Sequence, residues 1–149
     1  EGVLLGIRPS DAKIVWTAPP PPNPSNGYSA NAAAAASGGT SIVYTIGTAG
    51  CIVANYGATG KELWQACFPN ALHFAYEDPA TSPLVVNETF IAVNGGDGIV
   101  AFDTSLTTPN ANRLRWTQDI EQNNNIEGST YPPQASNGVV ATYFMGTLA

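Results

Sequence analysis

A repeat of about 48 residues constrains the fold of this chain more than any other feature of its sequence. Each copy contains a Gly or Ala within a β-prone stretch, followed by a Trp. The small residues stand 48, 47 and 48 residues apart, at Gly6, Ala54, Ala101 and Ala149. The tryptophans that follow the first three are Trp16, Trp64 and Trp116. Such a period indicates copies of one supersecondary unit, each packed against the next.

The third copy contains a longer loop than the first two. Ten residues separate the small residue from the Trp in the first two copies, and fifteen separate them in the third. Five extra residues, Leu106 to Asn110, therefore lie in this loop.

Local patterning indicates that each unit is a small antiparallel sheet, and it argues against a helical repeat. The stretches 41–46, 89–93 and 139–144 are rich in β-branched and aromatic residues, and Gly-containing turns bound them. About four short strands fit each unit, which is the number in one β-propeller blade. We therefore expect an all-β chain of about three four-stranded blades, forming an incomplete ring.

The repeat also predicts where the blades begin and end. The predicted units are a partial first blade at 1–18, a second at 30–67, a third at 80–119 and a partial fourth at 131–149. The predicted connections are 19–29, 68–79 and 120–130. The strands expected in the two complete blades are 30–37, 41–46, 50–55, 61–67, 80–86, 89–94, 98–103 and 112–119. The run Ala32–Ala36 has high helix propensity, but we assign it to the innermost strand, because small side chains fit near a crowded axis.

Three blades are too few for a large ring, since propellers usually close with about 4–8 blades. The chain begins and ends at the same phase of the repeat, within the third strand. A piece of a longer protein, several copies in one ring and a continuous stack of blades all fit this pattern. We favour the first.

The stretch 54–64, Ala-Asn-Tyr-Gly-Ala-Thr-Gly-Lys-Glu-Leu-Trp, resembles the tryptophan-docking motif of quinoprotein-like (pyrroloquinoline-quinone repeat) β-propellers. The stretch 82–103 resembles a whole repeat of that family. The resemblance implies that each indole stacks on the neighbouring blade. It assigns this structural docking role to Trp16, Trp64 and Trp116, with Gly6, Ala54, Gly60 and Ala101. The copies depart from the motif where Arg8 and Tyr56 replace its Asp, and where Ala12 stands in the place of Gly60.

The same family contains dehydrogenases that use pyrroloquinoline quinone and Ca²⁺. Their site has a vicinal Cys pair, whereas Cys51 and Cys67 are sixteen residues apart. All three tryptophans already belong to docking motifs. We therefore expect no catalytic, cofactor-binding or metal-binding residue in this stretch, and we expect His73 and Asp97 to be loop and turn residues. The alternative is a fragment of such a dehydrogenase, with the quinone and calcium held by blades outside the stretch.

Charge and composition narrow the classes of partner and the compartment. The net charge is −6 and only five residues are basic, too few to neutralise a run of phosphates, which excludes nucleic acid. No apolar run approaches the ~20 residues of a membrane span. Charged residues make up only 11% of the chain, against about 25% in typical soluble domains. This favours an extracellular or secreted protein, with the periplasm as the alternative.

The expected partners are proteins, either remaining blades of the parent chain or neighbouring subunits, with glycans as a second candidate. The sequence thus predicts a non-catalytic extracellular scaffold or interaction module. Asn87-Glu88-Thr89 is an N-glycosylation sequon on a predicted turn, so Asn87 is expected to carry a glycan if the source is eukaryotic.

The two cysteines are predicted to form a cross-strand disulfide. The strands 50–55 and 61–67 should form a hairpin, and the midpoint between Cys51 and Cys67 is residue 59, inside its loop. Facing residues in an antiparallel pair lie close enough for a disulfide. The bond would place the protein in an oxidising compartment; the alternative is two reduced cysteines, packed separately.

Overall fold

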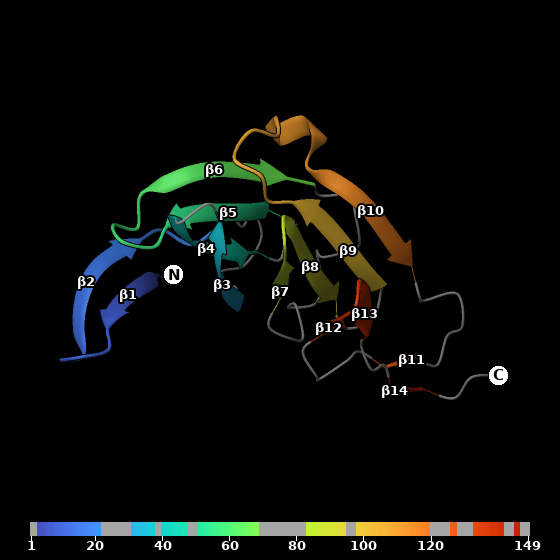
Figure 1. Ribbon diagram of the computed structural model, residues 1–149, viewed down its shortest axis with the longest axis horizontal. Coiled ribbons are helices and arrows are strands. Elements are labelled where there is room, and N and C mark those ends of the chain that lie inside the picture. The colour runs from blue at the N-terminus through green and yellow to red at the C-terminus, as the bar shows by residue number, and fades with distance from the viewer. Residues whose placement is uncertain are drawn as a thin grey trace.

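Short antiparallel strands make up almost all of the structure, as the repeat predicts (Figure 1). The computed structural model describes residues 3–21, 31–37, 40–47, 51–68, 83–94, 98–119, 126–127, 133–141 and 145–146. Within them, the only helical element is a single 3-10 turn, η1 (Asn110–Asn112). The predicted all-β class with an open, incomplete set of blades is confirmed. No helix in the described part of the chain is long and apolar enough to cross a membrane.

Two complete four-stranded sheets form the centre of the molecule. The second blade has the strand order β3 (Asn31–Ser37), β4 (Thr40–Ile46), β5 (Cys51–Tyr56) and β6 (Glu62–Cys67). The third blade has the order β7 (Leu84–Val86), β8 (Thr89–Asn94), β9 (Gly98–Asp103) and β10 (Leu114–Asp119). The helix-prone alanine run thus lies in β3, because pairing with β4 overrides local propensity.

Partial blades flank these two sheets. On the N-terminal side, β1 (Leu4–Arg8) and β2 (Lys13–Ala18) form the first hairpin. On the other side, β12 (Gln134–Ser136) pairs with β13 (Val139–Ala141). The short strand β11 (Ile126–Glu127) pairs with β14 (Met145–Gly146), although it lies in a stretch expected to be a connection.

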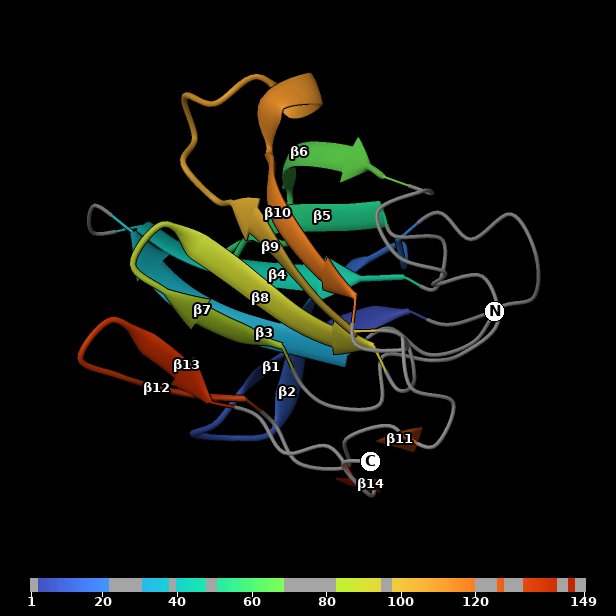
Figure 2. The same cartoon turned by 90° about the vertical axis from the view of Figure 1, so that its right-hand side faces the viewer.

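The hydrophobic core lies between the second and third blades. Strands β3 and β7 lie side by side (Figure 2), so the two sheets meet at their first strands. Side chains from both sheets interdigitate in one buried cluster. The second blade contributes Ile42, Tyr44, Ile46, Ile52, Ala54, Trp64 and Ala66, and the third contributes Phe90, Val100 and Phe102. Each sheet therefore covers apolar side chains of the other.

Candidate binding site at the junction of the two complete blades

The indole of Trp16 joins the first hairpin to the second blade. Its Nε1–H donates a 2.8 Å hydrogen bond to the carbonyl oxygen of Gly57, 41 residues along the chain. A Cβ at Gly6 or at Gly60 would collide with this indole. Gly60 also has φ +71°, a backbone conformation that favours glycine. The indole is thus held between glycines of two consecutive units.

Replacing Gly60 with Ala is expected to lower the free energy of unfolding by about 2 kcal/mol. The left-handed backbone costs a residue with a Cβ roughly 1–2 kcal/mol. The new Cβ would also stand 2.5 Å from Cε3 of Trp16, so the indole must shift and lose a hydrogen bond that contributes about 0.5–1.5 kcal/mol. Urea denaturation, followed by far-UV circular dichroism, measures the change.

Ala12 provides the matched control for Gly60. It occupies the equivalent loop position in the first hairpin, with φ +56°, and it is exposed. Changing Ala12 to Gly should relieve backbone strain and raise the free energy of unfolding by roughly 0.5–1 kcal/mol. If Gly60→Ala lost no more stability than Ala12→Gly gained, the left-handed backbone alone would account for glycine at residue 60, and close packing on the indole would not be needed.

The junction between the second and third blades is built differently. Trp64 is 7% exposed and packs at a tilt against Tyr44, with 5.9 Å between ring centroids. A guanidinium covers its ring, since Cζ of Arg113 lies 3.7 Å from the ring centroid. The Nε1–H of Trp64 has no hydrogen-bond partner among the described residues. Here the carbonyl of Thr104 accepts a 3.4 Å hydrogen bond from the Tyr44 hydroxyl.

The extended loop of the third blade holds Arg113 in this position. Its Nε donates to Oδ1 of Asn110 (3.1 Å), and its Nη1 donates to the backbone carbonyls of Asp103 (3.1 Å) and Ser105 (2.8 Å). Arg113 is only 2% exposed. Burial lowers the pKa of the Arg113 guanidinium, and the nearby Asp103 and Tyr44 oppose that shift. An arginine nonetheless stays protonated in proteins, so the junction contains a permanent buried cation.

Asp103 stabilises the start of the same loop. Its Oδ1 accepts a 2.8 Å hydrogen bond from the backbone N–H of Ser105, and its Oδ2 lies 2.9 Å from Nη2 of Arg115. Partial burial would raise the pKa of Asp103, but hydrogen bonds from Ser105 and Thr108 and the charge of Arg115 hold it below its ordinary value. A lowered pKa stabilises the folded state at neutral pH, and this contribution is lost as the pH falls through that lowered value.

An open cleft lies between β6 and the extended loop. Its volume is about 820 Å³, within the range of small-ligand sites. The walls combine one buried cation, one carboxylate and several uncharged side chains. They are formed by Glu62, Leu63, Trp64, Gln65, Leu106, Thr108, Pro109, Asn110 and Arg113. In Figure 1 the extended loop and η1, drawn in orange, lie above the neighbouring ends of β6 and β10.

Sequence reasoning did not predict a role for Arg113. The five-residue extension was evident as a break in the repeat, and Arg113 is the first residue after η1 within that longer loop. The unusual length of this loop, next to a docking motif, was therefore the feature of the sequence that could have drawn attention to Arg113.

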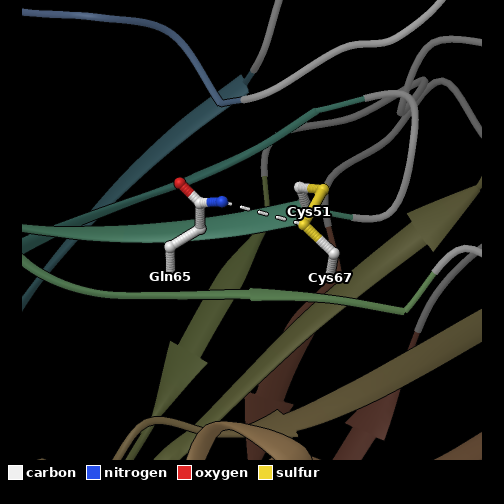
Figure 3. The surroundings of a disulfide bond; sticks show 3 residues. All are labelled: Cys51, Gln65 and Cys67. Carbon is white, nitrogen blue, oxygen red and sulfur yellow. Dashed lines mark hydrogen bonds between the residues drawn. A yellow bond between two sulfur atoms is a disulfide. The ribbon is translucent and has the colours of Figure 1, made fainter.

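The predicted disulfide is confirmed. Cys51 on β5 faces Cys67 on β6, and the two are bonded with 4.0 Å between their Cα atoms. Nε2 of Gln65 lies 3.9 Å from Sγ of Cys67 (Figure 3). The bond ties the start of the third strand to the end of the fourth, and thereby closes the open end of the hairpin.

Burial of Trp116 against a neighbouring blade is not seen among the described residues, so its docking role stays a prediction. Trp116 lies on β10, the last strand of the third blade, and is 44% exposed. In the first junction, the indole of Trp16 meets Gly57 and Gly60, three and six residues after Ala54.

Ala54 and Ala101 are fully buried on the third strands of their blades. His73 and Asp97 lie outside the described residues. Within the described ranges, no three His, Cys, Asp or Glu side chains gather in a way that could hold a metal ion.

Asn87 is exposed in the turn between β7 and β8, with φ +53°. If the source is eukaryotic, we expect peptide mass spectrometry of native secreted material to find an N-glycan on Asn87, removable by an amidase. Unmodified Asn87 throughout such material would contradict this expectation.

Comparison with known proteins supports the fold. No protein-family model matches the sequence, and no curated protein matches it. Among solved structures, the chain is similar to the crystal structure of BamB from Moraxella catarrhalis, with a TM-score of 0.57 and 18% sequence identity over 93% of this chain. The chain spans 39% of the length of that protein. At this identity the likeness shows the fold alone, and it supports β-propeller blades.

Proposed function

We propose that this chain is a non-catalytic protein-interaction module, built from quinoprotein-like propeller blades, that works in an oxidising compartment outside the cytoplasm. The observation that carries the proposal is the cleft at the junction of the second and third blades. Rigid elements form both of its walls, because β6 belongs to a four-stranded sheet and Arg113 fixes the extended loop through three hydrogen bonds. A preformed cleft of this kind binds a partner with little loss of conformational entropy.

The side chains best suited to chemistry have structural roles in the described part of the chain. Cys51 and Cys67 form the disulfide, which is the reason for placing the protein in an oxidising compartment. Asp103 caps the loop, Asp11 pairs with Arg8 in the first hairpin, and Tyr44 packs in the core. We infer that Trp16 and Trp64 serve to dock blades together, which makes the scaffold rigid.

Site-specific photocrosslinking in the source cells tests the interaction function. A benzophenone amino acid replaces Leu106, which lines the cleft and is 51% exposed. The control carries the same group at Leu5, which is 41% exposed on the first hairpin. We expect a discrete protein adduct at residue 106 that is absent at residue 5. Failure to form any protein adduct at residue 106 would contradict the proposal.

A second measurement separates this function from the dehydrogenase alternative. The protein, purified from its source, is titrated with pyrroloquinoline quinone and Ca²⁺, and dye reduction is followed with alcohol and aldose substrates. We expect neither cofactor binding nor turnover. Quinone-dependent turnover would contradict the proposal that the protein is non-catalytic.

A further inference from the structure

We propose that the cleft beside β6 recognises an acidic side chain carried on an extended segment of a partner protein, with Arg113 as the cationic anchor. This inference rests on the proposed interaction function and names the chemistry of the partner. The ligand would place one Asp or Glu carboxylate against the guanidinium and uncharged neighbours against the rest of the cleft.

Only some of the hydrogen-bond donors of Arg113 are used within the described part of the protein. Nε and Nη1 bind one side-chain oxygen and two backbone carbonyls, so they fix the guanidinium without neutralising it. Within the described residues no carboxylate lies within ion-pair distance of Arg113, and its Nη2 makes no hydrogen bond. Arg113 lines the cleft although only 2% of its surface is exposed, so it is 98% buried. A buried cation with no carboxylate in direct contact is costly: the nearby charge of Asp103 acts on Arg113 without pairing with it, and an incoming carboxylate would pair through a charge-assisted hydrogen bond.

The side chains that line the cleft favour particular residues on either side of that carboxylate in the partner segment. Leu63 and Leu106 are exposed aliphatic side chains, 39% and 51% exposed, and Pro109 adds a further apolar surface. Exposed leucines facing one cleft favour aliphatic residues on either side of the acid, since covering them removes apolar surface from water. A volume of about 820 Å³ accommodates a few residues of extended peptide.

Glu62 limits the number of acidic residues that fit. It lines the same cleft but is not ion-paired with Arg113 in the described structure. One carboxylate at Arg113 is therefore favourable, whereas a second one beside Glu62 would be repelled. The preferred segment carries a single acid among uncharged residues.

The partner segment is recognised mainly by side-chain contacts and not by adding a strand to the edge of the sheet. β6 is the last strand of its sheet, so its outer edge has no partner strand in the described ranges. The register between β5 and β6 shifts at Ala54 and Asn55, where Glu62 and Trp64 face successive residues and Leu63 is the extra one. Such a bulge at a sheet edge disfavours pairing with another strand, which leaves the cation and the leucines as the main contacts.

Nuclear magnetic resonance titrations with short peptides test the proposal. The probe is the tripeptide Leu-Glu-Leu, acetylated and amidated so that its side chain is the only carboxylate. The matched probes are Leu-Gln-Leu and Glu-Glu-Leu. Shifts of the Trp64 indole N–H and the Arg113 Nε–H signals report binding at 0.15 M salt, where the repulsive field of the net charge of −6 is screened beyond about 8 Å.

We expect Leu-Glu-Leu to bind with a dissociation constant on the order of 1 mM, as suits a small ligand with few contacts. Leu-Gln-Leu should bind at least about tenfold more weakly, which is the usual effect of removing a charged hydrogen-bond partner. Glu-Glu-Leu should also bind more weakly than Leu-Glu-Leu. Equal affinity for the Glu and Gln peptides would overturn acid recognition.

Three variants locate the site. Arg113→Met should abolish the preference for Glu, but it removes a buried cation and could unfold the loop. Leu106→Glu therefore provides a second measure, because an acid on this exposed wall should weaken binding about tenfold, while Leu5→Glu on the first hairpin should leave it unchanged. Equal loss in Leu106→Glu and Leu5→Glu would show that binding does not occur in the cleft.

Glu62→Gln offers a gain of affinity that a folding defect cannot mimic. It should tighten Leu-Glu-Leu binding about threefold and remove the penalty against Glu-Glu-Leu. An unchanged penalty would contradict the role of Glu62. If the crosslink at residue 106 forms while the peptides show no preference for Glu, acid recognition is wrong and the interaction function stands; loss of the crosslink refutes the function itself.

Discussion

Replacing Trp64 with Ala is expected to lower the free energy of unfolding by about 3–5 kcal/mol, the range for truncating a buried Trp. Trp64 is 7% exposed and belongs to the core shared by the second and third blades. Truncation leaves a cavity against Tyr44 and removes the aromatic ring that faces the buried guanidinium of Arg113. Equilibrium unfolding in urea, followed by circular dichroism, measures the loss.

Trp116→Ala is the matched control for that experiment. The same substitution on β10 removes an indole that is 44% exposed, so its cost should stay below about 1.5 kcal/mol. Comparable losses from Trp64→Ala and Trp116→Ala would contradict the description of the core, because they would require Trp116 to be packed as tightly as Trp64.

Removing the disulfide by the double change Cys51→Ser and Cys67→Ser is expected to lower the free energy of unfolding by about 3 kcal/mol. The bond closes a loop with a sequence separation of 16 residues. In the chain-entropy account, a loop of this length restricts the unfolded chain by about 3 kcal/mol. Urea unfolding of the native and double-Ser proteins measures the difference.

A reducing agent provides the control for the disulfide. It should destabilise the native protein by a similar amount and leave the double-Ser variant unchanged. If the native protein unfolds at the same urea concentration with and without reductant, and the thiols prove free by alkylation, the bond does not form in solution. The assignment of an oxidising compartment would then lose its support.

The repeat predicted the strands well because period and turn chemistry act locally. The predicted strands 89–94 and 98–103 match β8 and β9, and the hairpin register placed Cys51 opposite Cys67. The alanine run in β3 could be assigned only from the repeat, since its local propensity favours helix.

The candidate site could not be predicted in the same way. Arg113 is fixed by two backbone carbonyls and one Asn side chain, and backbone partners leave no pattern in a sequence. The contact between Arg113 and Trp64 joins residues 49 positions apart on different blades, so it depends on how the extended loop folds back over β6.

The placement of the core between sheets has a consequence for biosynthesis. The apolar face of the second blade is complete once residue 67 has left the ribosome, but Phe90, Val100 and Phe102 must follow before it is covered. That is about 35 more residues, or roughly 2–7 s at translation rates of about 5–20 residues per second. During this interval Ile42 and Ile52 are open to water, and a nascent chain at this stage is a natural substrate for chaperones. The hairpin between Cys51 and Cys67 is already complete in sequence, so an oxidase that acts during synthesis would close it before its neighbouring blade has emerged.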